Sequence, residues 1–257
     1  MQNLLQDIIV HNIFAFLLIF LRFGVALMIM PGIGDTFVSP KIRLLFGVAV
    51  SFVLTPVLLT HLPAIPANNI ALLMLMVSEL VTGIFIGTVM RILISALDTA
   101  GTIVSVQAGL STATMFNAQT HAETPIMSAV YSALGVTLIF ATNMDHQMIS
   151  AAANSYALFP VGAFPDVGSM SEVITRVTSL AFQVGVQITL PFIVVGLLLQ
   201  LGLGVLSRLM PQLQIFFIAL PVQIFLSLLL LMMTMSAGVL YWLDSYGNVL
   251  SNSILSQ

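Results

Sequence analysis

Two apolar stretches near the carboxyl-terminal end constrain the fold of this chain more than any other feature of its sequence. They cover residues 177–206 and 213–242, about 30 residues each, whereas one bilayer crossing needs only about 20 apolar residues. As α-helices at ~1.5 Å per residue, each would be roughly 45 Å long and would exceed a hydrocarbon core of ~30 Å. Neighbouring protein must cover the part of each helix that extends beyond the hydrocarbon core, or a kink or tilt must shorten the distance that the helix spans across the bilayer. A short turn at Arg208 and Pro211 joins the stretches, so we predict a long helical hairpin within a membrane assembly.

The composition extends this conclusion to the whole chain. Of its 257 residues, 59% are hydrophobic and only 6% are charged, whereas soluble domains carry about 25% charged residues. A soluble core of this size could not bury so much apolar surface, so the composition indicates a polytopic membrane protein. The six Lys and Arg residues form no basic patch, which argues against nucleic-acid binding.

Six apolar segments lie along the chain, and none has the alternation of barrel strands. Backbone groups in lipid must be satisfied internally, so we expect these segments to be helices. The sequence therefore predicts an all-α membrane protein with about six long hydrophobic helices. The segments are residues 13–30, 42–60, 70–97, 127–143, 177–206 and 213–242.

Two connecting segments do not fit a plain crossing. Residues 98–126 are rich in small, hydroxyl and amide side chains and contain no Lys or Arg. Such a segment is too polar for lipid, and non-helical backbone at membrane depth is tolerated where it lines or blocks a passage. Residues 144–176 contain two Phe-Pro pairs, and we interpret them as an external loop with some helix.

The few basic residues predict an orientation, because loops rich in Lys and Arg stay in the cytoplasm. Lys41 and Arg43 place the first loop inside, and the four crossings that follow return the turn at Arg208 to the same side. Both termini are expected outside.

Charged residues within apolar segments usually pair or face water. Arg22, Glu79 and Arg91 are such residues. Glu79 and Arg91 are twelve positions apart, about 18 Å along a helix, so they cannot pair with each other. We predict a buried pair of Arg22 with Glu79, and a structural ion pair is favoured over a proton-coupling site.

Four further residues are expected to shape helix packing. Gly83 and Gly87 form a GxxxG pattern that permits close backbone approach, either to another subunit or within this chain. Pro211 and Pro221 mark the start of the last helix, and a proline inside a helix produces a kink.

The sequence contains no pattern typical of a catalytic or metal site. Its four histidines are scattered, it has no cysteine, and neither HExxH nor a phosphate-binding loop occurs. The nucleophile-elbow pattern GxSxG is also absent. We therefore predict no enzyme activity, no catalytic residue, no cofactor and no metal.

Three stretches together resemble the FliR family of export-gate proteins, which includes the SpaR and SctT relatives in virulence secretion. Residues 22–43 place an arginine in the first helix, a Pro-Gly turn, and then a Pro-Lys-x-Arg start to the second helix. Residues 105–125 are small and polar after a Gly-containing third helix. Residues 210–224 read MPQLQIFFIALPVQI, with two prolines ten positions apart.

This resemblance implies an architecture that hydropathy alone would not suggest. Residues 1–170 would resemble the FliP subunit and contain a pore-plug segment at 105–121, and residues 171–257 would form a long hairpin resembling the FliQ subunit. The chain would join FliP and FliQ subunits around a central pore in the bacterial inner membrane, at the flagellar basal body. FlhB, exported flagellar proteins and membrane lipid would be further partners.

Within the plug segment, the small and apolar side chains are the residues expected to keep the pore shut at rest. A packed connector is the alternative interpretation of the same stretch. The plug residues are Gly109, Leu110, Ser111, Met115, Phe116 and Asn117.

The resemblance thus predicts a non-enzymatic subunit of the flagellar type III protein export gate, which admits unfolded substrates. A virulence secretion (injectisome) subunit is one alternative. A stand-alone transporter of small molecules or ions is the other, although the sequence shows no internal repeat of the kind that many transporters contain.

Overall fold

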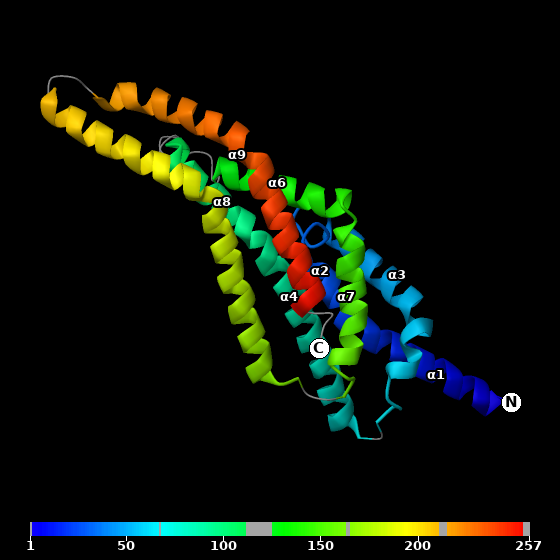
Figure 1. The fold of residues 1–257 in the computed structure, drawn as a ribbon. Helices are drawn as coiled ribbons and strands as arrows, with labels where there is room; N and C mark the ends of the chain where they lie inside the picture. The colour runs from blue at the N-terminus through cyan, green and yellow to red at the C-terminus, as the bar shows by residue number, and fades with distance from the viewer. Residues whose placement is uncertain (1, 67, 112–124, 163–164, 211–214, 254–257) are drawn as a thin grey trace. The chain divides into compact units, whose positions relative to one another are not determined.

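Long helices make up most of the part of the chain that the computed structural model describes, namely residues 2–66, 68–111, 125–162, 165–210 and 215–253 (Figure 1). Those residues form helices and their connections, so the predicted all-α membrane fold is confirmed. Five helical spans among them are long and apolar enough to cross a bilayer. They are Ile9–Ile29, Pro40–Leu58, Asn69–Gln107, Val167–Leu209 and Ala219–Ser251.

The helix contacts divide the chain into two compact units. Unit 1 comprises Met1–Ile92, Ile139–Val177 and Asn248–Gln257. Unit 2 comprises Leu93–Leu138 and Thr178–Gly247. Four helices contribute residues to both units, so this division follows contacts in space rather than the order of the sequence. They are α4 (Asn69–Gln107), α6 (Ile126–Ala141), α8 (Val167–Leu209) and α9 (Ile215–Ser253).

Unit 1 is built on the amino-terminal helices. Helix α1 (Gln2–Ile19) continues through a π-helical turn, η1 (Phe20–Gly24), into α2 (Val25–Ile29). Helix α3 (Pro40–Leu58) follows, with Pro40 in its first turn, where a missing N–H costs no hydrogen bond. A 3-10 turn, η2 (Leu59–His61), ends it.

Helix α4 (Asn69–Gln107) runs further than the sequence predicts. We expected the helix to end at residue 97 and the backbone beyond it to be non-helical, and this expectation is wrong for residues 98–107. The hydroxyls of Thr99 and Thr102 donate to the carbonyls of Ser95 and Asp98, one turn back, at 2.9 and 2.8 Å. These local bonds satisfy the polar side chains within the helix, so polarity alone does not end it.

The fourth predicted crossing is a broken helix. Helix α6 (Ile126–Ala141) stops before Asn143, which has a left-handed φ of 56°, and α7 (Met144–Leu158) begins directly after it. The two helices reach membrane-crossing length only as a bent pair, which is either a broken span or a re-entrant loop. The predicted external loop therefore contains a complete helix. Five spans of the described residues, or six with the bent pair, are long and apolar enough to cross a bilayer.

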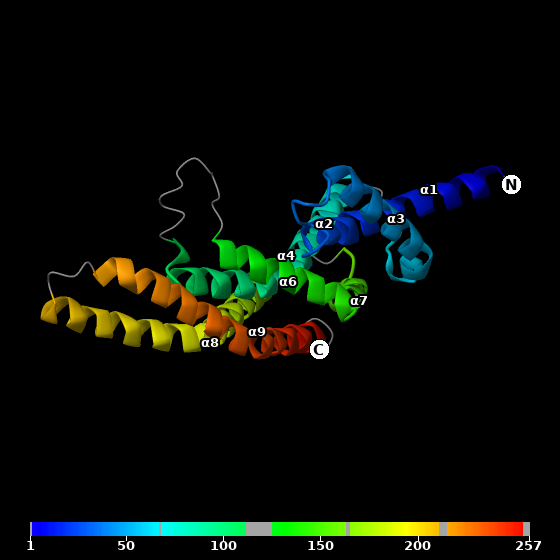
Figure 2. The same ribbon diagram turned by 90° about the horizontal axis from the view of Figure 1, so that it is seen from above.

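The carboxyl-terminal hairpin consists of α8 (Val167–Leu209, 43 residues) and α9 (Ile215–Ser253, 39 residues). Both helices are longer than predicted. The Asp166 carboxylate begins α8 by accepting hydrogen bonds from the N–H groups of Gly168 and Ser169 at 3.1 and 3.2 Å, an N-cap. Figures 1 and 2 show α8 and α9 side by side, each bending along its length, with Pro191 and Pro221 inside the helices.

Candidate functional site

The strongest polar contact in unit 1 joins η1 to α4. Arg22 Nε lies 2.7 Å from Glu79 Oε2, and Arg22 Nη2 lies 2.8 Å from Glu79 Oε1. The two side chains are 2% and 1% exposed. Such a bidentate ion pair is among the strongest hydrogen-bonded contacts that an arginine and a carboxylate can form. The structure therefore brings together the two residues that the sequence proposed as partners.

Two residues at the end of α7 complete the surroundings of Arg22. Arg22 Nη2 also donates to the Phe159 carbonyl at 2.9 Å. The Tyr156 ring lies under the guanidinium, with its centroid 4.1 Å from the guanidinium carbon, a cation–π distance. Arg22 thus holds three helical elements of unit 1 together. The sequence predicts neither contact, since an aromatic ring gives no sign of its partner and every residue has a backbone carbonyl.

Two glycines of α4 make the close approach to Arg22 possible. A Cβ atom on Gly83 would lie 2.3 Å from the Arg22 carbonyl oxygen, and one on Gly87 would lie 2.9 Å from the Ala26 carbonyl oxygen. Both distances are shorter than any van der Waals contact. The GxxxG pattern therefore packs α4 against η1 and α2 of the same chain.

The connection between α2 and α3 is held by its own charged residues. Asp35 Oδ2 accepts the N–H of Gly32 at 2.7 Å, and Asp35 Oδ1 lies 3.2 Å from Arg91 Nη2. Arg43 donates to the carbonyls of Val38 and Gly34, both at 3.0 Å. Arg91, a candidate functional charge in the sequence, is thus a partly exposed partner of this connection.

The predicted plug segment begins at an ordered junction in unit 2. Gln223 Nε2 on α9 donates to the carbonyl of Gln107, the last residue of α4, at 2.6 Å. Gly109 follows with a φ of +72°, and a Cβ on it would lie 3.4 Å from the side chains of Leu220 and Gln223. The Ser105 hydroxyl accepts the N–H of Met127 at 3.2 Å, which joins the ends of α4 and α6.

Only part of the predicted plug can be placed. Leu110 and Ser111 are helical and half-buried. Met115, Phe116 and Asn117 lie outside the described residues, as does Pro211 at the turn of the hairpin. Pro221 lies in α9 and is exposed.

Helix α9 has the least covered surface among the described helices of membrane length. Only 6% of its most apolar stretch is buried, against 22% in both α8 and α3. Exposed side chains recur along α9 every three or four residues, which places them on one face of a helix. They include Val222, Phe225, Leu229, Met232 and Met233.

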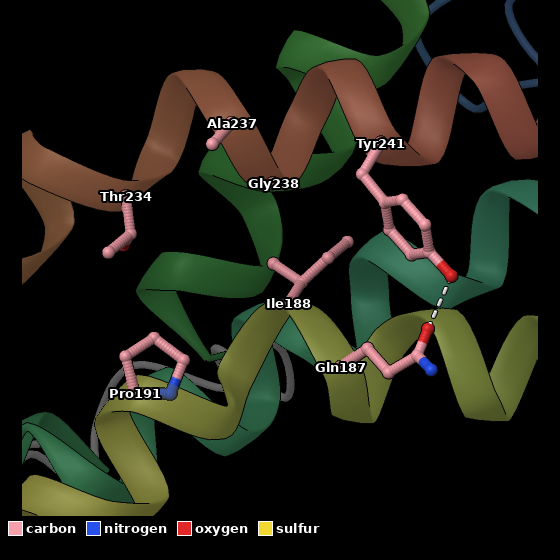
Figure 3. A pocket seen from close by; sticks show the side chains of 7 residues that line it. All are labelled: Gln187, Ile188, Pro191, Thr234, Ala237, Gly238 and Tyr241. Carbon is pink, nitrogen blue, oxygen red and sulfur yellow. Dashed lines mark hydrogen bonds between the residues drawn. The ribbon is translucent and has the colours of Figure 1, made fainter.

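A groove lies between α8 and α9 (Figure 3). It has a volume of about 440 Å³ and is lined from α8 by Gln187, Ile188 and Pro191. Thr234, Ala237, Gly238 and Tyr241 line it from α9. The Tyr241 hydroxyl donates to Gln187 Oε1 across the groove.

Acidic and histidine side chains do not gather into a metal-binding cluster in the portion of the chain that the structure describes. Two of the carboxylates contact arginine instead: Glu79 lies 2.7 Å from Arg22, and Asp35 lies 3.2 Å from Arg91.

Long apolar helices, a buried ion pair and an uncovered hairpin define a multi-pass integral membrane protein of helical type, located in the bacterial inner membrane. The chain belongs to the bacterial export proteins, family 1, whose family model matches residues 13–249. The resemblance noted at residues 22–43, 105–125 and 210–224 is confirmed by this match and by the relatives.

Relatives named flagellar biosynthetic protein FliR come from several bacteria. The chain is 34% identical over 233 residues to the flagellar biosynthetic protein FliR of Caulobacter vibrioides, covering 91% of this chain and 93% of that protein. It is 31% identical over 193 residues to FliR of Escherichia coli, covering 74% and 72%. It is 26% identical over 227 residues to FliR of Bacillus subtilis, covering 86% of each.

Proposed function

We propose that this chain is a non-enzymatic subunit of the bacterial flagellar type III protein export gate, where it helps form the pore through which unfolded flagellar proteins enter. The observation that carries the proposal is the end-to-end match to a protein named flagellar biosynthetic protein FliR, over 91% of the chain. The relatives reported above are named flagellar, which favours the flagellar system over a virulence system.

The uncovered hairpin supports a role inside an assembly rather than a role alone. At ~1.5 Å per residue, the 43 residues of α8 extend roughly 65 Å, far beyond a hydrocarbon core of ~30 Å. Lipid can cover only part of such a helix, and other subunits must cover the rest. Subunits of the FliP and FliQ types are the partners we propose, with FlhB at the same gate.

The proposed likeness of residues 1–170 to FliP and of residues 171–257 to FliQ agrees with this view. In that arrangement the amino-terminal part would continue a ring of FliP-like subunits. The hairpin would occupy the place of one further FliQ-like subunit.

The Arg22–Glu79 pair is best interpreted as a structural anchor. A proton-coupling carboxylate needs access to water, whereas Glu79 is 1% exposed and accepts two hydrogen bonds from one guanidinium. The same guanidinium also holds the Phe159 carbonyl. Each of these contacts would have to break before Glu79 could exchange a proton.

We further propose that the segment after Gly109 closes the pore at rest. The chain just before this segment is held to α9, because Gln223 Nε2 donates to the Gln107 carbonyl. Deleting residues 110–117 keeps Gly109 and that anchor. We expect the gate to assemble in normal amount and the membrane to leak small ions, measured as conductance on the same preparation. An assembled gate with unchanged conductance would refute the plug, and loss of assembly would support a packed connector.

Complementation combined with purification tests the function as a whole. A flagellated bacterium lacking its own FliR gene would receive this chain with an affinity tag. We expect restored secretion of flagellar proteins and co-purification of FliP and FliQ in one high-mass complex. A chain that purifies alone, stays folded and moves a small solute in vesicles would support the transporter alternative instead.

A further inference from the structure

Three helical spans of membrane length in unit 1 meet at the connection between α2 and α3. Arg91 Nη1 on α4 donates to the carbonyl of Ile29, the last residue of α2, at 3.3 Å, and Arg91 Nη2 lies 3.2 Å from Asp35 Oδ1. Helix α3 begins directly after the connection, at Pro40. At ~1.5 Å per residue, the 19 residues of α3 extend roughly 28 Å, close to a hydrocarbon core of ~30 Å. The connection therefore lies at the level where α3 meets the surface of the bilayer.

This connection carries an excess of positive charge. Half of the six basic residues in the chain belong to it or contact it, namely Lys41, Arg43 and Arg91. Asp35 is the sole acidic residue in the sequence between positions 29 and 45, and it offsets one of the three positive charges. Two positive charges therefore have no acidic partner among the described residues.

Lys41 is the most available of these charges. It is exposed, and its ammonium group makes no hydrogen bond or ion pair with any residue that the structure describes. Arg43, in contrast, donates to the carbonyls of Val38 and Gly34 and holds the connection in place. A lysine at the end of a membrane helix keeps its charged group at the level of the lipid headgroups. Lys41 can therefore contact a bound anion without breaking any contact of the fold.

The helix after Lys41 presents an apolar stripe on the same face. Positions four, seven and eleven residues after Lys41 share its face of the helix. They hold Leu45, Val48 and Phe52, which are 67%, 37% and 72% exposed. The face thus has a positive group at its end and apolar groups along the length that crosses the bilayer. A phospholipid has the complementary order, since its charged headgroup is followed by acyl chains.

The length of α3 favours lipid as the occupant of this face. Lipid cannot cover all 43 residues of α8, whereas the 19 residues of α3 match one crossing of a bilayer. A free anion such as inorganic phosphate would contact Lys41 and leave the apolar stripe uncovered. Basic residues beside a membrane span attract anionic lipids, and a zwitterionic lipid would bring a positive charge of its own. An anionic phospholipid therefore fits both parts of the face.

We propose that this face of α3 binds an anionic phospholipid, with the headgroup phosphate at Lys41 and an acyl chain along Leu45, Val48 and Phe52. Arg43 and Arg91 add to the positive potential at the headgroup. The bound lipid would fix the depth of α3 in the bilayer. This site is independent of the proposed export function, because it requires only unit 1 and a membrane.

Native mass spectrometry of the full chain, released from detergent micelles that contain one added lipid, tests this proposal. We expect phosphatidylglycerol, which is anionic, to bind at lower lipid concentrations than phosphatidylcholine, which is zwitterionic. Lys41→Gln should weaken the binding of phosphatidylglycerol about fivefold, the equivalent of ~1 kcal/mol for one basic residue at an anionic surface. Lys41→Arg keeps the charge and should keep the affinity.

Arg176→Gln is the matched control, since it removes one positive charge from an exposed side chain of α8. It should leave the binding of phosphatidylglycerol unchanged. Leu45→Asn keeps Lys41 and should weaken binding, because the acyl chain loses an apolar contact. Equal binding of the two lipids, or equal losses for Lys41→Gln and Arg176→Gln, would overturn the proposal. Displacement of the lipid by inorganic phosphate, with no effect of Leu45→Asn, would assign the site to a free anion and would overturn it as well.

Discussion

The buried arginine of unit 1 and the bare hairpin show opposite ways of building a membrane protein. Around Arg22, an opposite charge, a backbone carbonyl and an aromatic ring from other elements of the same chain contact one guanidinium, and glycines bring the backbones together. Along α9, large side chains such as Phe225 and Met232 are 69% and 84% exposed. Charged contacts buried within one chain indicate a scaffold, and apolar surface left uncovered indicates an interface.

The largest expected effect comes from breaking the scaffold at its ion pair. Glu79→Ala leaves the Arg22 guanidinium buried without its counter-charge, which costs about 3–5 kcal/mol. We expect a correspondingly large loss in the free energy of unfolding of the detergent-purified protein, measured by denaturant titration.

Two controls sharpen this result. Glu172→Ala removes a carboxylate from an exposed pair with Arg176 and should cost at most about 1 kcal/mol. Replacing both buried partners, Arg22→Met with Glu79→Leu, should be less harmful than Glu79→Ala alone, because no charge is then left unpaired. Equal losses for Glu79→Ala and Glu172→Ala would show that the pair is not a scaffold.

A smaller loss is expected from adding one methyl group between helices. Gly83→Ala places a Cβ 2.3 Å from the Arg22 carbonyl oxygen, so α4 must move away, at about 1–3 kcal/mol. Gly204→Ala on the hairpin is the matched control, since a Cβ there meets nothing within 4 Å. It should be neutral or slightly stabilising, because alanine favours a helix more than glycine does. Thermal unfolding of the two variants side by side measures the contrast.

On the hairpin, a single substitution at an exposed apolar side chain should weaken assembly of the complex and leave the folding of the chain almost unchanged. Met232 is 84% exposed, so Met232→Asn should alter the unfolding free energy of the isolated chain by less than about 0.5 kcal/mol. It should nevertheless reduce the amount of chain in the high-mass complex on native gels, and Met232→Leu should not. If Met232→Asn unfolds the chain, the hairpin belongs to the scaffold and the comparison fails.

The smallest expected effect lies at the start of α8. A hydrogen bond from the Ser169 hydroxyl, followed by bonds from the N–H groups of Gly168 and Ser169, holds the pKa of the Asp166 carboxyl below its usual range. The pKa is therefore lower in the folded than in the unfolded chain, where it is about 3.9. The resulting stabilisation is complete above that pH and is lost as the pH falls through the folded pKa.

A comparison with Asp166→Asn checks the direction in which this stabilisation changes with pH. The unfolded-state pKa is about 3.9. The difference in melting temperature between the wild type and Asp166→Asn should therefore be constant at roughly pH 6 to 8 and should shrink below about pH 4. A difference that grows on acidification would contradict the assignment of Asp166 as a charged cap.

The hairpin and the pair of Arg22 with Glu79 could be predicted because each rests on a local rule. A long apolar run must be helical in lipid, and a buried charge must find its opposite. The continuation of α4 to Gln107, the break at Asn143 and the contact with Tyr156 depend on packing between distant segments. The small and polar residues after position 97 suggested a gate, yet Gly101 is small because the Ser128 backbone lies against it.

Crosslinking along the uncovered face of α9 tests the central claim most directly. Photo-reactive amino acids replace Val222, Phe225, Leu229 and Met233 one at a time, in native membranes that contain the complete gate. The account predicts that other protein subunits are captured at most of these positions, because the hairpin is an interface within an assembly. Capture of lipid at all four positions, in membranes where the gate is intact, would contradict it.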